Sequence, residues 1–269
     1  NCRFIKGDIL DLQRMVNASK NVETIYNIAA EANVNRFVES PLYSNLITSH
    51  GLLCVLEAAK INNVKRVIHA STEWVYGSVE GNEDEIITED TPYTQNPDHI
   101  YTSSKIAAEL FIKNYYNFFG IEFTIIRYGI PFGERARLET VTPIFIKKII
   151  NGEILTIHGD GSQTRQFIYV RDLAAGNVAC IKEEAKNEIF NINGQKKISV
   201  LDIVRTLEII LNKKAKIEFV PDRIGNFKGR FISSEKAKRL LGWEPEYTYE
   251  EAMEYYVNWF IKNVLKKEG

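Results

Sequence analysis

Hydrophobic positions along the chain fall into two alternating kinds of segment. Short β-branched or apolar runs predict strands, and longer amphipathic stretches between them predict helices. The expected strands are residues 2–5, 22–30, 64–70, 122–128, 154–157, 166–170, 189–192 and 217–220. The expected helices are residues 12–18, 41–60, 100–119, 142–150, 171–184, 200–211, 233–241 and 249–264. Such alternation is typical of an α/β protein, with a parallel sheet covered by helices on both faces.

The alternation changes after Pro131, where the strands become shorter. We therefore expect two units, a larger one that contains the parallel sheet and a smaller C-terminal α/β lobe interleaved with the end of that sheet. The larger unit comprises residues 1–131 together with 168–195. The smaller lobe comprises residues 132–167 together with 196–269.

Composition narrows the class of protein. The chain has 269 residues, of which 45% are hydrophobic and 26% are charged, as is ordinary for a globular protein. Its net charge of -1 gives no reason to expect nucleic acid or an anionic membrane as a partner. Every apolar run is shorter than the roughly 18 residues that a membrane helix requires.

Cysteine and histidine spacing indicates neither a disulfide framework nor a metal site. The cysteines are far apart and odd in number, so we expect a reducing, cytoplasmic location; they are Cys2, Cys54 and Cys180. The histidines lack metal-ligand spacing and are interpreted as structural; they are His50, His69, His99 and His158.

One stretch, residues 66–105, combines a hydroxyl, a phenol and an ammonium. Its strand ends in Ser71-Thr72, and after an acidic loop a helix begins with Tyr101 and Lys105. These two residues are four apart and share one face of the helix. A free phenol has a pKa of about 10, and a nearby ammonium with an oxidised nicotinamide would bring it into the range of a general base. The alternative is an ordinary helix surface, because a chain with 13 tyrosines produces this spacing by chance.

Other candidate side chains lie near the carboxyl ends of the predicted strands, where parallel sheets bind ligands. Thr72 could hydrogen-bond a sugar hydroxyl and relay its proton to Tyr101. Glu73 could be a second acid or base, or merely a loop carboxylate, and Arg127 could be an edge charge. Three arginines could clamp a phosphate, although each alone is more often a solvated surface residue; they are Arg165, Arg223 and Arg230.

Motifs that occur in order along nearly the whole chain resemble those of the extended short-chain dehydrogenase/reductase proteins, in particular the nucleotide-sugar epimerases and dehydratases. The matching stretches are Gly7-Asp8-Ile9 with Asp11, Ala29-Ala30, Asn45, Leu56-Glu57-Ala58-Ala59, Val64-Lys65-Arg66-Val67, Ser71-Thr72, Val75-Tyr76-Gly77, Thr88-Glu89-Asp90, Tyr101 with Lys105, Arg127-Tyr128-Gly129, Gly159-Asp160-Gly161 with Arg165, Tyr169-Val170, Asp172-Leu173-Ala174, Lys236-Ala237 and Leu241-Gly242-Trp243 with Pro245. The resemblance implies a Rossmann-like doubly wound sheet that binds NAD, with NADP left open. It also implies a smaller lobe that binds a nucleoside-diphosphate sugar.

The resemblance further implies roles for single residues. Tyr101 would take the proton from the sugar 4-hydroxyl while hydride passes to the nicotinamide. Lys105 would hold the nicotinamide ribose and tune Tyr101, Thr72 would position the 4-hydroxyl, and Glu73 would be a further catalytic candidate. The expected cofactor contacts are Asp8, Ile9, Ala29, Ala30, Asn45, Ser71, Tyr101, Lys105 and Tyr128. The expected substrate contacts are Thr72, Arg165, Arg223 and Arg230.

Two positions depart from the family's pattern. In 4,6-dehydratases the Ser/Thr is usually followed by an acidic pair, or by a glutamate two positions on, for the dehydration step. Here Thr72 is followed by Glu73 and Trp74. An indole cannot do acid–base work, so the sequence favours an epimerase, although Glu73 keeps a dehydratase open. Many members carry Asn where Ile130 stands, so backbone or water must replace that substrate contact.

The family's first strand and its Gly-rich phosphate turn, G-x-x-G-x-x-G, have no counterpart in the sequence. In the doubly wound order 3-2-1-4-5-6, residues 2–5 would be the third strand and would lack their neighbour. The helix N-terminus that cradles the pyrophosphate would also be missing. We therefore expect the 269 residues to belong to a longer protein and, by themselves, to bind NAD poorly or not at all.

The function expected from the sequence is that of a UDP-sugar 4-epimerase, which forms a transient 4-keto sugar. One alternative is a nucleotide-sugar 4,6-dehydratase. Another is a non-catalytic member that binds NAD or a protein, since fold alone does not fix function. A homodimer is expected from the resemblance, with the helices at 41–60 and 100–119 paired across a two-fold axis.

Overall fold

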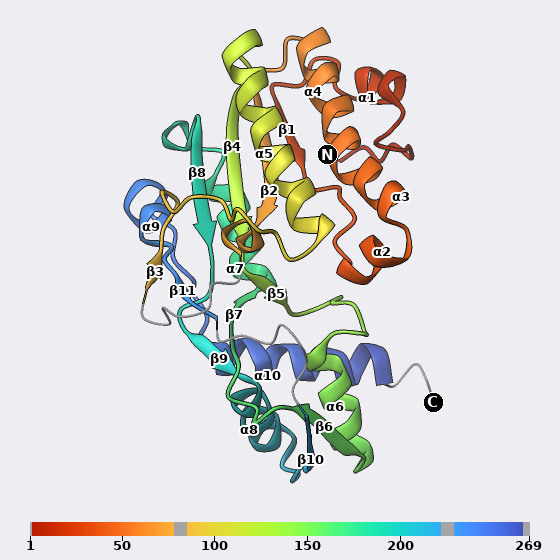
Figure 1. Ribbon diagram of the computed structural model, residues 1–269, viewed down its shortest axis with the longest axis vertical. Helices are drawn as coiled ribbons and strands as arrows, with labels where there is room; N and C mark the ends of the chain where they lie inside the picture. Colours follow the sequence, from red (N-terminus) through yellow and green to blue (C-terminus); the bar gives the residue numbers. More distant parts are fainter. Residues whose placement is uncertain (1, 78–84, 222–228, 266–269) are drawn as a thin grey trace.

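A four-stranded parallel sheet lies at the centre of the larger part of the protein, for which a computed structural model describes residues 2–77, 85–221 and 229–265 (Figure 1). The strands lie in the order β1-β2-β4-β8. Their bounds are Thr24–Asn27 for β1, Arg66–Thr72 for β2, Glu122–Tyr128 for β4 and Glu188–Ile192 for β8. Adjacent strands pair in parallel, with Thr72 opposite Tyr128 at the carboxyl edge.

Helices cover both faces of this sheet, so the expected doubly wound α/β fold is confirmed. On one face α4 (Gly51–Ile61) and α5 (Ile100–Phe119) pack against β2 and β4 through a buried apolar cluster. On the other face α7 (Val170–Ala179) and α9 (Glu235–Leu241) pack around Ile68 and Ile126. Because side chains alternate along a strand, neighbouring positions of β2 face different helices.

The chain between β1 and α4 is more broken than the sequence predicts. Instead of one helix over residues 41–60, it forms α3 (Pro41–Asn45), a π turn η1 (Leu46–His50) and then α4, preceded by the unpredicted α2 (Val34–Glu39). The helix α1 (Leu12–Ala18) has the predicted bounds and begins at Asp11, whose side chain accepts a hydrogen bond from the Arg14 backbone N–H.

Two expectations for this unit were wrong. Residues 2–5 form no strand, and Phe4 is 88% exposed. Among the described residues no strand lies beside them to complete a backbone ladder. The predicted helix over 171–184 stops at Ala179, and a single turn η3 (Glu183–Ala185) follows. The acidic loop expected between Thr72 and Tyr101 spans residues 78–99, and its first part, residues 78–84, lies outside the described residues. Within this loop Ile86–Ile87 forms the unpredicted strand β3, which pairs with β11 (Phe231–Ile232).

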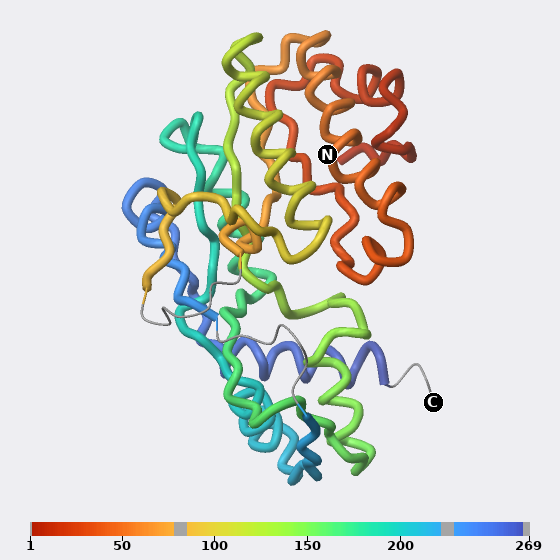
Figure 2. The backbone as a smooth tube through the Cα atoms, viewed as in Figure 1, coloured from red at the N-terminus to blue at the C-terminus, as the bar shows by residue number. Residues whose placement is uncertain are grey.

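The smaller part of the protein lies beyond the carboxyl edge of the main sheet (Figures 1 and 2). It has a three-stranded sheet in the order β5-β7-β9 and a parallel pair β10-β6. The helices α6, α8 and α10 enclose an apolar core with these strands. The bounds are Ile130–Phe132 for β5, Val141–Asn151 for α6, Ile154–His158 for β6, Thr164–Tyr169 for β7, Lys197–Ser199 for β9, Val200–Leu211 for α8, Lys216–Val220 for β10, Tyr249–Phe260 for α10 and Ile261–Leu265 for the final turn η4.

The chain passes between the two parts more than once. After β7 it enters α7, which covers the main sheet, and β8 then completes that sheet. The division into a larger unit and a smaller lobe, with the boundaries given above, remains our proposal. No helix in the described part of the chain is both long enough and apolar enough to cross a membrane.

Asp172, in the first turn of α7, ties the C-terminal segment to the main sheet. Its buried carboxylate accepts hydrogen bonds from the backbone N–H groups of Glu246 at 3.0 Å and Tyr247 at 3.4 Å. The indole N–H of Trp243 donates to its backbone carbonyl at 3.1 Å. One side chain therefore fixes the start of the chain that leads into α10.

We expect Asp172→Ala to lower the free energy of unfolding by about 1–3 kcal/mol, because it leaves two backbone N–H groups without an acceptor. Chemical denaturation measures this change. Glu250→Ala is the matched control, since it removes a half-exposed carboxylate that pairs with Lys196 and should cost less than about 0.5 kcal/mol. Equal losses in the two variants would contradict the assignment.

Candidate active site

The predicted hydroxyl, phenol and ammonium come together where β2 ends and α5 begins. Thr72, Tyr101 and Lys105 are each at most 9% exposed. The Tyr101 hydroxyl lies close enough to Thr72 for Thr72 to influence its pKa, and its ring lies edge-on to Phe37 at 5.5 Å between centroids. Lys105 Nζ donates to the backbone carbonyl of Ala70 at 2.8 Å. The structure thus brings together the three residues that the sequence singled out.

Burial sets the protonation of this cluster in the chain alone. Burial raises the pKa of Tyr101, and Glu73 adds to this effect, while the interaction with Thr72 and the charge of Arg137 oppose it. Burial lowers the pKa of Lys105 to about 8, and the negative charge of Glu109 opposes that shift. The phenol is therefore neutral and the ammonium mostly charged near neutral pH. The lowering of the Tyr101 pKa expected from Lys105 with an oxidised nicotinamide is not a property of the chain alone.

Glu73 begins the short turn η2 (Glu73–Tyr76) directly after Thr72. Its carboxylate accepts a hydrogen bond from Asn193 Nδ2 at 3.2 Å. Burial raises the pKa of Glu73 to about 7, although the bond from Asn193 and the charge of Arg165 act in the opposite direction. A carboxyl group with this pKa exchanges its proton readily near neutral pH.

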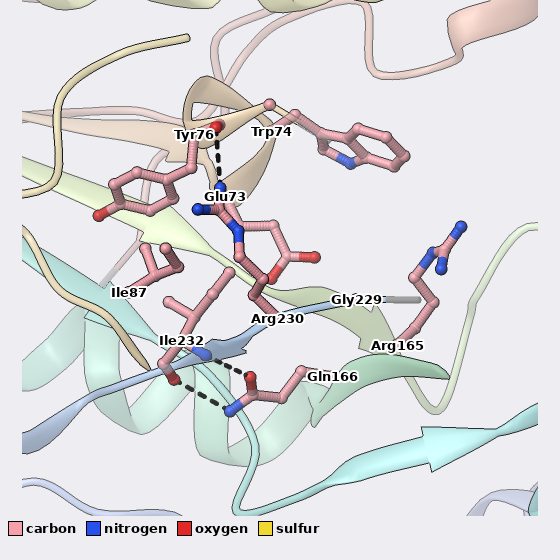
Figure 3. A pocket seen from close by; sticks show the side chains of 10 residues that line it. Glu73, Trp74, Tyr76, Ile87, Arg165, Gln166, Gly229, Arg230 and Ile232 are labelled. Atoms are coloured by element: carbon pink, nitrogen blue, oxygen red, sulfur yellow. Dashed lines mark hydrogen bonds between the residues drawn. The ribbon is translucent and has the colours of Figure 1, made fainter. Parts of the chain in front are cut away.

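An open cleft lies beside Glu73, between the main sheet and the smaller lobe (Figure 3). It is lined by Glu73, Trp74, Tyr76, Gly77, Ile87, Arg165, Gln166, Gly229, Arg230 and Ile232. Gln166 exchanges two hydrogen bonds with the backbone of Ile232, at 2.9 and 3.0 Å, which hold β7 against β11. The wall of the cleft is therefore fixed by backbone as well as side-chain contacts.

Two of the three arginines expected to bind substrate line this cleft. Arg230 donates to Glu85 Oε2 at 3.0 Å and to the backbone carbonyl of Tyr76 at 3.1 Å, so its guanidinium is held in one orientation. Arg165 lies on β7 and donates to the Thr164 carbonyl at 2.8 Å. The third, Arg223, lies outside the described residues. Two cations on the wall suit an anionic ligand such as a diphosphate.

The residues expected to contact the cofactor differ in their exposure and in their hydrogen bonds. Ala29 is exposed and Ala30 half-buried just after β1. Asn45 is exposed and accepts a hydrogen bond from Ser49 Oγ at 2.9 Å. Asp8 is exposed and accepts one from the Leu10 N–H at 2.9 Å. Their contacts with a cofactor remain predictions.

The side chains of three further expected cofactor contacts are engaged within the protein. Ile9 packs against α4, where Gly51 leaves the necessary room. The Ser71 hydroxyl donates to Glu109 Oε1 at 2.5 Å, and the Tyr128 hydroxyl donates to Asn177 Oδ1 at 2.5 Å. The Ser71 side chain points toward α5 and the Tyr128 side chain toward α7, so a cofactor would meet mainly their backbone.

The hydrogen-bond donors of the buried Lys105 ammonium indicate whether the site fits a dinucleotide cofactor. An ammonium has three donor positions, and among the described residues only the Ala70 carbonyl accepts from it. A buried cation with unused donors beside a buried phenol fits a ribose and a nicotinamide at the carboxyl edge of the sheet. Lys105 and Tyr101 are thus the residues that would hold this end of the cofactor.

Sequence reasoning missed Glu109, Asn193 and Arg137. Glu109 lies one helical turn beyond Lys105 on the same face of α5, a spacing visible in the sequence. Asn193 directly follows β8 at the same sheet edge as the other candidates, and a Cβ on Gly129 would lie only 1.7 Å from its Oδ1. Arg137, in the loop between β5 and α6, gave no signal in the sequence. No group of three or more His, Cys, Asp or Glu residues in the described ranges could hold a metal ion.

The parallel sheet, the buried Thr72–Tyr101–Lys105 cluster and the cationic cleft together define a Rossmann-like protein of the extended short-chain dehydrogenase/reductase class. The chain belongs to the NAD dependent epimerase/dehydratase family, whose model matches residues 1–193. The resemblance described from the sequence is therefore confirmed. The expected cofactor, NAD, is the one that the family's description names.

Three similar proteins show the range of this family. A UDP-glucuronate 4-epimerase of Thermodesulfobacterium geofontis is 32% identical over 98% of this chain and 81% of its own length. The crystal structure of a UDP-glucose 4-epimerase from Thermotoga maritima with UDP-glucose has a TM-score of 0.89 and 27% identity, covering 98% of this chain and 86% of that one. A dTDP-glucose 4,6-dehydratase from Streptomyces venezuelae with NAD bound has a TM-score of 0.87 and 26% identity, covering 97% and 80%. This chain is thus a nucleotide-sugar epimerase or dehydratase in general type.

The raised pKa of Glu73 makes the stability of the protein depend on pH. The pKa is about 7 in the folded protein and 4.5 for an unperturbed group. Protonation of Glu73 therefore stabilises the folded protein. This contribution to the unfolding free energy is complete below about pH 4.5 and is lost as the pH rises through about 7. We expect Glu73→Gln to gain about 1–3 kcal/mol in unfolding free energy relative to the natural protein across this window. Urea unfolding at several pH values measures this gain, with the exposed Glu254→Gln as control. A difference that stays constant with pH would contradict the assignment.

Proposed function

We propose that the protein is a nucleotide-sugar 4-epimerase that inverts C4 of a UDP-sugar through a transient 4-keto sugar. The observation that carries the proposal is the buried Tyr101 phenol, which interacts with Thr72 and lies one helical turn from the buried Lys105. A hydroxyl, a phenol and an ammonium that lie near one another can provide a path for one proton between a sugar hydroxyl and the protein.

In this proposal each residue has one task in moving that proton. Thr72 orients the sugar 4-hydroxyl, and Tyr101 accepts its proton and later returns it. Lys105 stabilises the phenolate by its charge, and Arg165 and Arg230 hold the diphosphate against the wall of the cleft. When bound, NAD supplies the acceptance and return of hydride. Inversion requires that the sugar ring turn in the cleft between these two events.

The cleft favours epimerisation over dehydration. Removal of water from C5 and C6 of the sugar requires one group to take the C5 proton and another to protonate the C6 oxygen. Among the described residues that line the cleft, Glu73 is the only carboxylate, and its neighbour Trp74 packs edge-on against His99 at 5.0 Å. The Trp74 indole cannot donate or accept a proton near neutral pH. A 4,6-dehydratase remains the second candidate because the pKa of Glu73 suits an acid–base role.

A non-catalytic role is the third candidate, and the buried cluster speaks against it. A protein that only binds has no need of a desolvated phenol and ammonium, since each costs free energy to bury. Their retention beside Thr72 supports catalysis.

Product analysis separates the three candidates. We expect the full-length natural protein, supplied with NAD and UDP-glucose or dTDP-glucose, to yield the C4 epimer, detected by chromatography of the released sugar. A 4-keto-6-deoxy product would instead make it a dehydratase, and absence of turnover by the full-length natural protein would favour a binding role.

Tyr101→Phe tests the central residue of the same reaction. We expect a loss of kcat of at least about 100-fold, because proton transfer contributes this much. Tyr116→Phe, on the same helix α5, is the matched control and should leave the rate unchanged. Equal rates for natural protein and Tyr101→Phe would show that the phenol takes no part.

We further propose a homodimer that pairs the outer faces of α3, α4 and α5. These segments expose large apolar side chains, including Leu42 at 82% and Phe118 at 78%. A monomeric surface rarely leaves so many apolar groups in water. We expect sedimentation velocity at micromolar concentration to give a dimer, and Leu42→Glu to give a monomer. A monomeric natural protein would contradict this proposal.

A further inference from the structure

Glu109 is the most completely buried charged group in the described part of the protein, with 0% exposure. Both carboxylate oxygens are occupied by donors. Oε1 accepts from Ser71 Oγ at 2.5 Å and Arg127 Nε at 3.1 Å. Oε2 accepts from Arg127 Nη2 at 2.8 Å and the Tyr93 hydroxyl at 2.9 Å. The pair with Arg127 is therefore bidentate and fully satisfied, which is the condition under which a buried ion pair persists.

Three consecutive residues at the end of β2, Ala70, Ser71 and Thr72, interact with one face of α5. Ala70 accepts a hydrogen bond from Lys105, Ser71 donates one to Glu109, and Thr72 interacts with Tyr101. Three consecutive residues of β2 are thus attached to three successive turns of the helix. Loss of the middle attachment would release the end of β2 from the helix that carries the phenol and the ammonium.

Glu109 also supplies negative charge beside Lys105. The two residues are four apart on α5 and so lie on the same side of the helix. The negative charge of Glu109 opposes the effect of burial on the pKa of Lys105. On β2, burial and then the charge of Lys105 lower the pKa of His69 well below its usual value, so His69 is neutral and adds no charge.

Other elements packed against this part of α5 bring few further charges near Lys105. Their titratable groups are Arg36 and Glu39 on α2, Tyr43 on α3, His50 on η1, Cys54, Glu57 and Lys60 on α4, Arg66 and His69 on β2, Glu73 and Tyr76 on η2, and Glu122, Arg127 and Tyr128 on β4. Glu57 is bonded to Lys60 and Tyr115, and Arg127 faces Glu109 itself. Glu109 is therefore the carboxylate whose charge reaches Lys105 most directly.

We propose that Glu109, held by Arg127, is a positioning residue for the Tyr101–Lys105 pair: it fixes α5 on the end of β2 and keeps the Lys105 ammonium charged. The catalytic meaning of this role rests on the proposed function, because it is the phenolate of Tyr101 that the ammonium is needed to stabilise. The effect on the charge of Lys105 does not depend on any reaction.

A double-mutant cycle tests the charge directly. The titration of Lys105 is followed by NMR in protein with isotope-labelled lysine Cε, and Lys105→Arg identifies its signal. Glu109→Gln should move the titration to lower pH by about one unit, since an opposite charge one turn away shifts a pKa by about that much. Arg127→Met should move it to higher pH, because the Glu109 charge is then unopposed. The double variant Glu109→Gln/Arg127→Met should lie between Glu109→Gln and the natural protein.

The double variant keeps the test decisive if either single variant fails to fold, because it leaves no unpaired buried charge. Tyr93→Phe is the matched control, since it removes one hydrogen bond to Glu109 and no charge, and should leave the titration within a few tenths of a unit. An unchanged or raised Lys105 titration in the double variant would overturn the proposal.

Kinetics then separate this proposal from the proposed function. The alkaline limb of kcat/KM should move to lower pH in Glu109→Gln and in the double variant, with kcat falling and KM little changed. A merely structural role would lower activity at every pH without moving the limb, and this result would overturn the proposal. If the protein turns over no nucleotide sugar, the proposed function fails, while the NMR titration still decides the role of Glu109.

Discussion

The buried ion pair between Glu109 and Arg127 is the interaction on which the larger unit depends. It joins α5 to β4, and its neighbours extend the network to three other elements. Ser71 brings in β2, and Arg127 Nη1 donates to the Tyr76 hydroxyl at 2.8 Å, which in turn donates to Asn191 of β8 at 2.6 Å. Two buried charges cost much desolvation energy, so their retention is understandable only because every donor and acceptor around them is satisfied. The network fixes β2, β4, β8, η2 and α5 in one arrangement.

The hydrophobic pattern predicted the elements that carry a long, regular apolar stripe. The bounds of α5, β4 and α8 are those expected, because local periodicity and the residues at the ends suffice there; Gly120, for example, ends α5 in the left-handed conformation. The pattern failed where a strand exists only through a distant partner. Ile86–Ile87 is a strand because it pairs with Phe231–Ile232, and residues 2–5 are apolar enough for a strand but have no such partner among the described residues.

The site could be predicted in part for a related reason. Thr72, Tyr101 and Lys105 follow from the rule that ligands lie at strand ends and from the four-residue spacing on a helix, and both rules are local. Glu109 has the same spacing from Lys105, but a glutamate on a helix is usually solvated, and only the fold shows that Arg127 and Ser71 enclose it. Arg127 was expected as an edge charge for the same reason, although it is buried. A sequence gives the position of a charge and not its depth.

Burial also sets the pKa values of the candidate site and therefore which proton transfers it can support. Burial raises the pKa of Glu73 to about 7 and lowers that of Lys105 to about 8, so an acid and a base of ordinarily very different strength become nearly matched. Near neutral pH, the site therefore holds a carboxyl group that is partly protonated, a neutral phenol and an ammonium. Glu73 and Lys105 can therefore exchange protons near neutral pH, whereas the Tyr101 phenol, whose pKa is raised, becomes a base only with further positive charge beside it. The same burial that costs stability is thus what suits these residues to reversible chemistry, in which the proton that is taken must also be returned.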